Sequence, residues 1–321
     1  MDKKKIYILG FFLIISISVI STFIPRYILY IVAMMCIWSI GALSLNLLLG
    51  YTGLLNLGHA SIIGIGAYTS AILTLRLGVS AWLALPVVVA LTTVFGVLLG
   101  LICLRTKEMH FAVITLMFGI MIYFIFRTWE GLTGGVYGLT NIPRPTPISL
   151  PFLTIDFKSI NVWFIFIIII LLLSVFFLIK LINSKIGRVF MCVRDDERLA
   201  TMMGADVRKY KILSCAIACF IAGIAGWLFV HFLTHVAPES FSFSFSFELL
   251  IYTLFGGINS IMGPIFGTFA IRSIYEILNP MQEIRFLISA ITILLVIRFL
   301  PEGVYVSLKK KFKTLKENLK K

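Results

Sequence analysis

The sequence predicts an all-α integral membrane protein with about ten transmembrane helices. Of its 321 residues, 60% are hydrophobic and 13% are charged, whereas soluble domains are about half apolar and a quarter charged. Apolar runs such as 6–24 and 162–182 reach about 20 residues, the length of helix that crosses a hydrocarbon core of roughly 30 Å. Basic residues gather in short segments beside these runs, which is typical of the cytosolic side of a membrane protein.

Hydrophobic runs predict the individual spans. They lie near residues 6–24, 27–49, 60–76, 81–104, 109–126, 161–182, 211–233, 247–258, 261–279 and 284–300. The first run follows a lysine cluster but lacks a small-residue cleavage site, so we expect a retained helix and not a signal peptide. The Gly-rich region 247–279 is compatible with one span or with two.

Three basic segments set the expected orientation: Lys3 to Lys5, the loop 183–210 and the tail 302–321. The positive-inside rule places all three in the cytosol, with both termini. An even number of crossings must then follow residue 210, which favours two spans within 247–279. Ten crossings would form two inverted halves of five, a common plan in transporters. The net charge of +14 therefore indicates contact with anionic membrane lipid, and we expect no nucleic-acid partner.

The segment from Gly50 to Ala60 interrupts an apolar region with glycines and polar residues. Non-helical backbone inside a bilayer is tolerated only where protein or a water-filled cavity satisfies its polar groups. Glycine permits the turns, and Thr52, Asn56 and His59 supply hydrogen-bonding side chains. Such a segment can hold a small zwitterion. A tight connection at the membrane edge, where glycines let helices pack closely, explains the same residues.

The basic loop contains a short predicted helix. Asp195 is expected to cap it, Asp196 and Glu197 favour its N-terminus, and Gly204 suits its end. The surface that this helix offers combines an acidic residue, small residues and two methionines, namely Glu197, Ala200, Gly204, Met202 and Met203. This surface suits docking into a partner's groove, or it belongs to a solvated amphipathic helix.

Two further patterns lie in the second half of the chain. Serine and phenylalanine alternate from Ser240 to Phe247, which predicts an external extended segment with one apolar face. Arg272 and Glu276 are one helical turn apart and are expected to pair. Cys215 and Cys219 have no adjacent histidine or acid, so we expect small packing residues and no metal site.

The sequence contains no phosphate-binding loop, no H-E-x-x-H and no G-x-S-x-G motif. We therefore expect no catalytic residues, no enzymatic activity and no cofactor bound by this chain itself.

Several segments together resemble the M-type permease subunit of branched-chain amino-acid ABC importers. They are GYTGLLNLGHASIIGIGAYTSAIL from Gly50, HFAVITLMFG from His110, TGGVYGLTNIP from Thr133, SKIGRVFMCVRDDERLATMMGADVRKYKI from Ser184 and LFGGINSIMGPIFG from Leu254. They stand in the family's order and cover most of the chain. Residues 117–120 depart from the pattern, because many members carry a more polar or acidic end to that helix.

The resemblance implies one permease domain over 1–321 in the inner membrane, with a cytosolic coupling helix. Its partners would be a second homologous permease, two ABC ATPases that bind the ATP, and an extracytoplasmic substrate-binding protein. The implied coupling residues are Asp195, Asp196, Glu197, Ala200, Met203 and Gly204. The implied pathway candidates are Thr52, Gly53, Asn56, Gly58, His59, Gly256 and Gly257. The alternatives are an ABC permease for urea, amides or another small solute, and an ion-coupled amino-acid carrier.

Overall fold

The computed structural model describes residues 25–103, 108–150 and 153–277, together with 298, 303–305 and 307. The predicted span 6–24, the predicted span 284–300 apart from residue 298, and almost all of the basic tail 302–321 lie outside these described residues.

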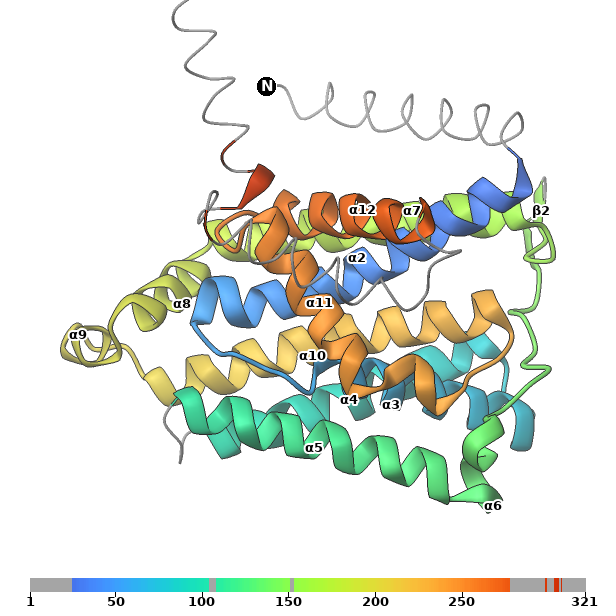
Figure 1. The fold of residues 1–321 in the computed structure, drawn as a ribbon, viewed down its shortest axis with the longest axis horizontal. Helices are drawn as coiled ribbons and strands as arrows, with labels where there is room; N and C mark the ends of the chain where they lie inside the picture. Colours follow the sequence, from blue (N-terminus) through green and yellow to red (C-terminus); the bar gives the residue numbers. More distant parts are fainter. Residues whose placement is uncertain are drawn as a thin grey trace, which may run out of the picture.

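Long apolar helices running side by side form the body of the protein (Figure 1). Among the described residues, five helices are long and apolar enough to cross a membrane. They are α2 (Arg26–Thr52), α4 (Ala81–Cys103), α5 (Glu108–Thr128), α7 (Ile160–Asn183) and α10 (Val207–Leu233). Each coincides with a predicted hydrophobic run, so the composition identified the membrane-spanning character correctly.

Helices α2 and α10 form the centre of the bundle. Within their most apolar windows, 72% of α2 and 67% of α10 is buried inside the protein, against 28% of α4. The outward residues of α4, such as Leu83 and Val94, are large and apolar. In a bilayer that surface contacts hydrocarbon. Lipid tails are as apolar as these side chains, so no hydrophobic driving force buries them inside the protein.

Three shorter helices complete the membrane part: α3 (His59–Arg76), α11 (Phe243–Gly256) and α12 (Met262–Ile277). From the end of α2 the chain 53–58 runs back along the bundle before α3 begins, and 234–242 runs back in the same way between α10 and α11 (Figure 1). The region 247–279 therefore holds parts of two helices. The glycines at 256 and 263 let their ends approach closely.

Loops lie at both ends of the bundle (Figure 1). At one end, α8 (Lys185–Asp195) and α9 (Glu197–Met202) project from it. At the other end lie α6 (Glu130–Thr133), the 3-10 helix η1 (Gly135–Tyr137) and an antiparallel hairpin of β1 (Ile148–Leu150) and β2 (Leu153–Ile155). The loop regions 129–159 and 184–206 therefore lie at opposite ends of the bundle.

The expected extended segment from Ser240 to Phe247 is wrong. The chain forms the 3-10 helix η2 (Pro238–Phe241) and then α11. Phe241 and Phe245, four residues apart, are buried, whereas Phe243 is exposed. A spacing of four residues places two side chains on one face of a helix, and the alternation of Ser and Phe in the sequence does not distinguish this from a strand. Phe241 packs against the rings of Tyr68 and Phe229 inside the bundle, away from the outer surface.

Candidate functional site: two helix breaks and a cytosolic helical loop

The first break, residues 53–58, has several backbone amides hydrogen-bonded to protein groups. Gly53 ends α2 in the left-handed conformation, with φ of 74°. The side chain of Asn56 accepts a hydrogen bond from the Gly58 amide at 2.9 Å, and the Leu57 amide donates to Thr115 Oγ1 at 3.1 Å. Thr52 is buried and donates to the Leu48 carbonyl within its own helix. Non-helical backbone can persist here because its polar groups have partners.

His59 begins α3 deep in the bundle. Its Nε2 lies 2.6 Å from Ser44 Oγ, about two turns before the end of α2. The side chain is fully buried, and its Nδ1 has no hydrogen-bond partner among the described residues. The adjacent Gly58 packs on the Thr115 carbonyl and approaches Gly119, so no larger side chain fits.

The starts of α3 and α11 meet. The Ala60 amide in the first turn of α3 donates to Ser246 Oγ in the first turn of α11 at 3.1 Å. The second break, residues 234–242, begins at Thr234, which ends α10 with φ of 62°. Two helices thus begin inside the bundle and face each other with their N-termini.

Gly256 and Gly257 lie at the opposite end of α11, next to the end of α2. The Asn46 amide on α2 donates to the Ser260 carbonyl in the α11–α12 connection at 3.0 Å, and Gly50 packs on the Ile258 carbonyl. The structure therefore brings Gly256 and Gly257 close to the end of α2, while His59 and Asn56 lie deeper in the bundle.

Asp196, and not Asp195, caps the loop helix. The Asp196 carboxylate accepts from the amides of Arg198 at 2.7 Å and Leu199 at 3.1 Å. Its extended backbone separates α8 from α9, so Asp195 is the last residue of α8. The sequence placed the cap one residue too early because either aspartate can play that part. Gly204, with φ of 86°, ends the turn as predicted.

The two sides of α9 differ in exposure. Ala200 is 2% exposed and Glu197 pairs with Lys211 on α10, so this side faces the body of the protein. Met202 and Met203 are 82% and 83% exposed, and Leu199 is exposed beside them. An outward apolar group on a projecting, otherwise polar loop is typical of a protein-binding surface.

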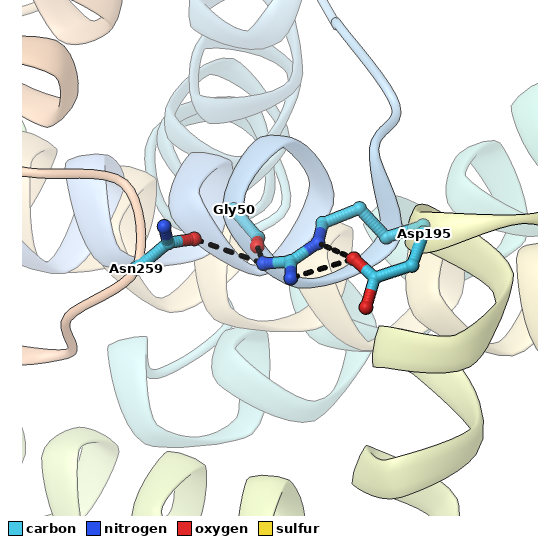
Figure 2. Close-up of polar contacts among 4 residues, drawn as sticks. Gly50, Asp195 and Asn259 are labelled. Atoms are coloured by element: carbon cyan, nitrogen blue, oxygen red, sulfur yellow. Dashed lines mark hydrogen bonds and ion pairs between the residues drawn. The ribbon is translucent and has the colours of Figure 1, made fainter. Parts of the chain in front are cut away.

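Arg194 connects this loop to the membrane helices, as Figure 2 shows. Its Nη1 donates to the Gly50 carbonyl at 2.7 Å and to Asn259 Oδ1 at 2.9 Å. Its Nε and Nη2 donate to Asp195 Oδ1. One guanidinium thus joins the end of α8, the end of α2 and the α11–α12 connection.

From the sequence, Arg194 is only one of several basic residues in the loop 183–210, and no local pattern singles out Lys211 or Asn259. The partners of Arg194 lie 144 and 65 residues away, which no local pattern reveals. Arg272 was assigned the wrong partner, since its Nη2 lies 3.2 Å from Glu248 Oε2 on α11. Glu276 instead accepts a hydrogen bond from the Tyr27 hydroxyl.

The bundle, the internal helix breaks and the projecting helical loop define a multi-pass membrane protein of the transporter class. The chain belongs to the family described as the branched-chain amino acid transport system permease component, whose model matches residues 27–298. It is therefore a transport subunit and not an enzyme.

Named relatives agree with this family. The high-affinity branched-chain amino acid transport system permease protein LivM of Escherichia coli is 30% identical over 287 residues, covering 84% of this chain and 67% of the relative. The LivM protein of Salmonella typhimurium is 29% identical over 321 residues, covering 94% and 75%. A probable LivH permease of Methanocaldococcus jannaschii is 25% identical over 241 residues, covering 71% and 73%. No solved structure matches the chain.

Proposed function

We propose that this chain is the permease subunit of an ATP-driven importer of leucine, isoleucine and valine in the cytoplasmic (inner) membrane. The observation that carries the proposal is the similarity to LivM proteins over most of the chain. Similarity to a LivH protein as well as to LivM proteins supports a pore made of two related permeases. Two ATPases would bind and hydrolyse ATP, an external binding protein would deliver the amino acid, and this chain would bind no cofactor.

The proposed topology has ten crossings in two inverted halves, with both termini in the cytosol. Two matching helix pairs support it. Helices α2 and α10 have 27 residues each, and both end in a left-handed residue, Gly53 and Thr234. In each case the chain then runs back into the bundle and starts a shorter helix. The equivalent breaks are thus 53–58 and 234–242, and Gly256–Gly257 belongs to a different connection.

The proposed coupling helix is α9, with residues 195–204 around it. Its outward side chains Met202 and Met203 would enter a groove of an ATPase, and Glu197 would hold the helix against Lys211. Movement of the ATPases would reach the membrane helices through Arg194, which contacts Gly50 and Asn259. Because α2 and the α11–α12 connection then move together, the substrate pathway could open on alternate sides.

The proposed pathway wall runs from the α2 terminus to the start of α3, with the residues Thr52, Gly53, Asn56, Gly58, His59, Gly256 and Gly257. Left-handed glycines at 53 and 257 mark where the backbone changes direction. Backbone outside regular helices has fewer constraints on its torsion angles, so such points can absorb the change between two conformations.

The test is uptake of labelled leucine by proteoliposomes that hold this chain, a second permease and the ATPases, with binding protein supplied outside. We expect uptake that requires ATP and is competed by isoleucine and valine. ATP-dependent uptake of urea or amides without leucine would retain the importer and overturn the substrate. Uptake that survives without ATP and collapses with an ionophore would overturn the importer in favour of an ion-coupled carrier.

A further inference from the structure

A cavity of about 170 Å³ lies between α2 and α12. Its wall includes aromatic and apolar residues of α2 and two charged residues of α12, namely Tyr30, Ile31, Met34, Trp38, Arg272 and Glu276. A water molecule takes a share of about 30 Å³ in the liquid, so the cavity has room for a small solute. Tyr30 and Trp38 lie about one and three turns from the start of α2, which the proposed topology places in the outer half of the membrane.

Arg272 lines this cavity with a partly exposed guanidinium. Its guanidinium pairs with Glu248 through Nη2 at 3.2 Å and lies 5.8 Å from the Trp38 ring. Its Nε is buried and has no hydrogen-bond partner among the described residues. Guanidinium groups present several donors in a planar fork that matches a carboxylate, so a carboxylate in the cavity would bind the part of the Arg272 guanidinium that is not enclosed, the side chain being 24% exposed.

Glu276 supplies the opposite charge. It lies one helical turn after Arg272 on α12, and both residues line the cavity. Since Arg272 pairs with Glu248 and Glu276 binds the Tyr27 hydroxyl, the two cavity charges do not neutralise each other. Charged residues inside a membrane span are costly, and they commonly mark substrate pathways.

The remaining wall is suited to an apolar group. Met34 and Ile31 give the cavity an apolar surface, and the unbranched Met34 side chain can adapt to the shape of a ligand. The Trp38 ring also lines the cavity. Aromatic faces also attract an ammonium group. The cavity therefore combines a cation, an anion and an apolar surface within the size of one small molecule.

We infer that this cavity binds a zwitterionic amino acid with a branched apolar side chain. The Arg272 guanidinium binds the carboxylate, Glu276 with the exposed face of Tyr30 binds the ammonium group, and Met34 and Ile31 contact the side chain. This inference rests on the proposed function and adds a substrate-binding site to it. A phosphatidylethanolamine head group shares the amine and the acid group, so the test must separate the two ligands.

The first test is photolabelling of the complete transporter in vesicles with a diazirine analogue of leucine. We expect the label on the peptide that carries Met34 and Trp38, with competition by leucine, isoleucine and valine. Leucinol, which lacks the carboxylate, should compete at least about tenfold less well, because a hydrogen bond between charged groups contributes that much or more. Labelling elsewhere, or equal competition by leucinol, would overturn the inference.

Paired variants separate binding from folding. Replacing Arg272 alone would leave the Glu248 carboxylate buried without its partner, which destabilises the protein. The double variant Glu248→Gln with Arg272→Met removes both charges together. Its matched control is Asp206→Asn with Lys209→Met, which removes an exposed ion pair whose residues do not line the cavity. We expect the KM for leucine uptake to rise about 10- to 100-fold in the double variant and less than about 2-fold in the control.

The outcomes distinguish the two proposals. If the wild-type complex shows no ATP-dependent leucine uptake, the proposed function fails. If the wild type imports leucine and the folded double variant does so with unchanged KM, only the cavity assignment fails. If wild-type protein retains phosphatidylethanolamine, the double variant loses it and leucine does not compete with the label, the cavity binds lipid and the inference is overturned.

Discussion

The two helix breaks both begin at a residue with a positive φ, but they are connected to opposite ends of the molecule. The first, 53–58, follows the end of α2, where Arg194 of the cytosolic loop binds the Gly50 carbonyl. The second, 234–242, follows the end of α10, where Val236 forms a bridge with Leu139 of the loop at the other end. One break is therefore connected to the surface proposed to meet the ATPases. The other is connected to the side proposed to meet the binding protein.

The breaks also differ in how their conformations are accommodated. The first uses glycine at its left-handed residue and at its closest backbone contact, Gly53 and Gly58. The second holds a threonine, Thr234, in the left-handed region, where β-branched residues are rare. Close packing therefore requires glycine in the first break, whereas the second break contains a residue in a strained backbone conformation.

The largest effect should come from filling the first break. In Gly58→Val the added side chain would overlap the Thr115 backbone carbonyl, which cannot rotate away as a side chain would. Even ordinary overpacking costs about 1–3 kcal/mol, so we expect little folded protein. The measurement is the amount of monodisperse protein after extraction and size-exclusion chromatography. Gly131→Val is the control, since nothing lies within 4 Å of a Cβ there, and equal yields of both would contradict the packing argument.

A second large effect should follow charge reversal in the loop helix. Asp196→Lys with Glu197→Lys removes the α9 cap and the contact with Lys211. We expect ATP-dependent uptake to be abolished while the protein still inserts, because a cap contributes only about 1 kcal/mol to a loop outside the membrane. Glu130→Lys, an exposed acid at the other end, should import normally. Normal uptake in the double variant would remove the coupling role of α9.

An intermediate effect is expected at Arg194. Arg194→Ala loses the hydrogen bonds to Gly50 and Asn259, each of which contributes about 1.5–3 kcal/mol where a charged donor is involved, or less at this partly exposed site. We expect the assembled complex to retain ATP hydrolysis while uptake per ATP falls about 10-fold. Arg188→Ala, on the same helix α8, is the matched control. If both variants transport at the same rate per ATP, Arg194 does not couple the movement of the cytosolic loop to the first break.

The smallest effect should distinguish the left-handed residues of the two breaks. Thr234→Gly relieves a conformation that costs an ordinary L-residue roughly 1–2 kcal/mol, whereas Gly53→Thr introduces that cost. Thermal unfolding in detergent should therefore shift upward for Thr234→Gly and downward for Gly53→Thr. A lower melting temperature for Thr234→Gly would mean that the Thr234 hydroxyl contributes more than the backbone strain costs.

Hydrophobic runs located the described helices to within a few residues, because a bilayer requires long apolar segments wherever the chain crosses it. They could not show that α3 and α11 begin inside the bundle, since the contacts of these starts with Thr115 and Ser246 join residues far apart in the sequence. The Ser and Phe alternation was misleading for the same reason. Whether one of its phenylalanines is buried or exposed depends on the residues that pack on it, and these residues lie on other helices.

The loop helix was predicted closely, because capping and glycine termination are local. Its orientation was not, because the contact of Glu197 with Lys211 spans separate elements. The pairing of Arg272 with Glu248 was missed for a related reason. A spacing of one turn suggested a pair within α12, but Glu248 lies on the adjacent helix α11.

The meeting of α3 and α11 at their N-termini has an electrostatic consequence. The amide groups at the start of a helix carry a partial positive charge of about half an elementary unit, and here two such ends lie together, joined by the Ala60 amide and Ser246. Sodium ions and protons moving toward this point meet a repulsive potential, as they do at paired half-helices in water-selective pores. A membrane that must maintain its voltage could thus admit a neutral zwitterion here without admitting a leak of cations.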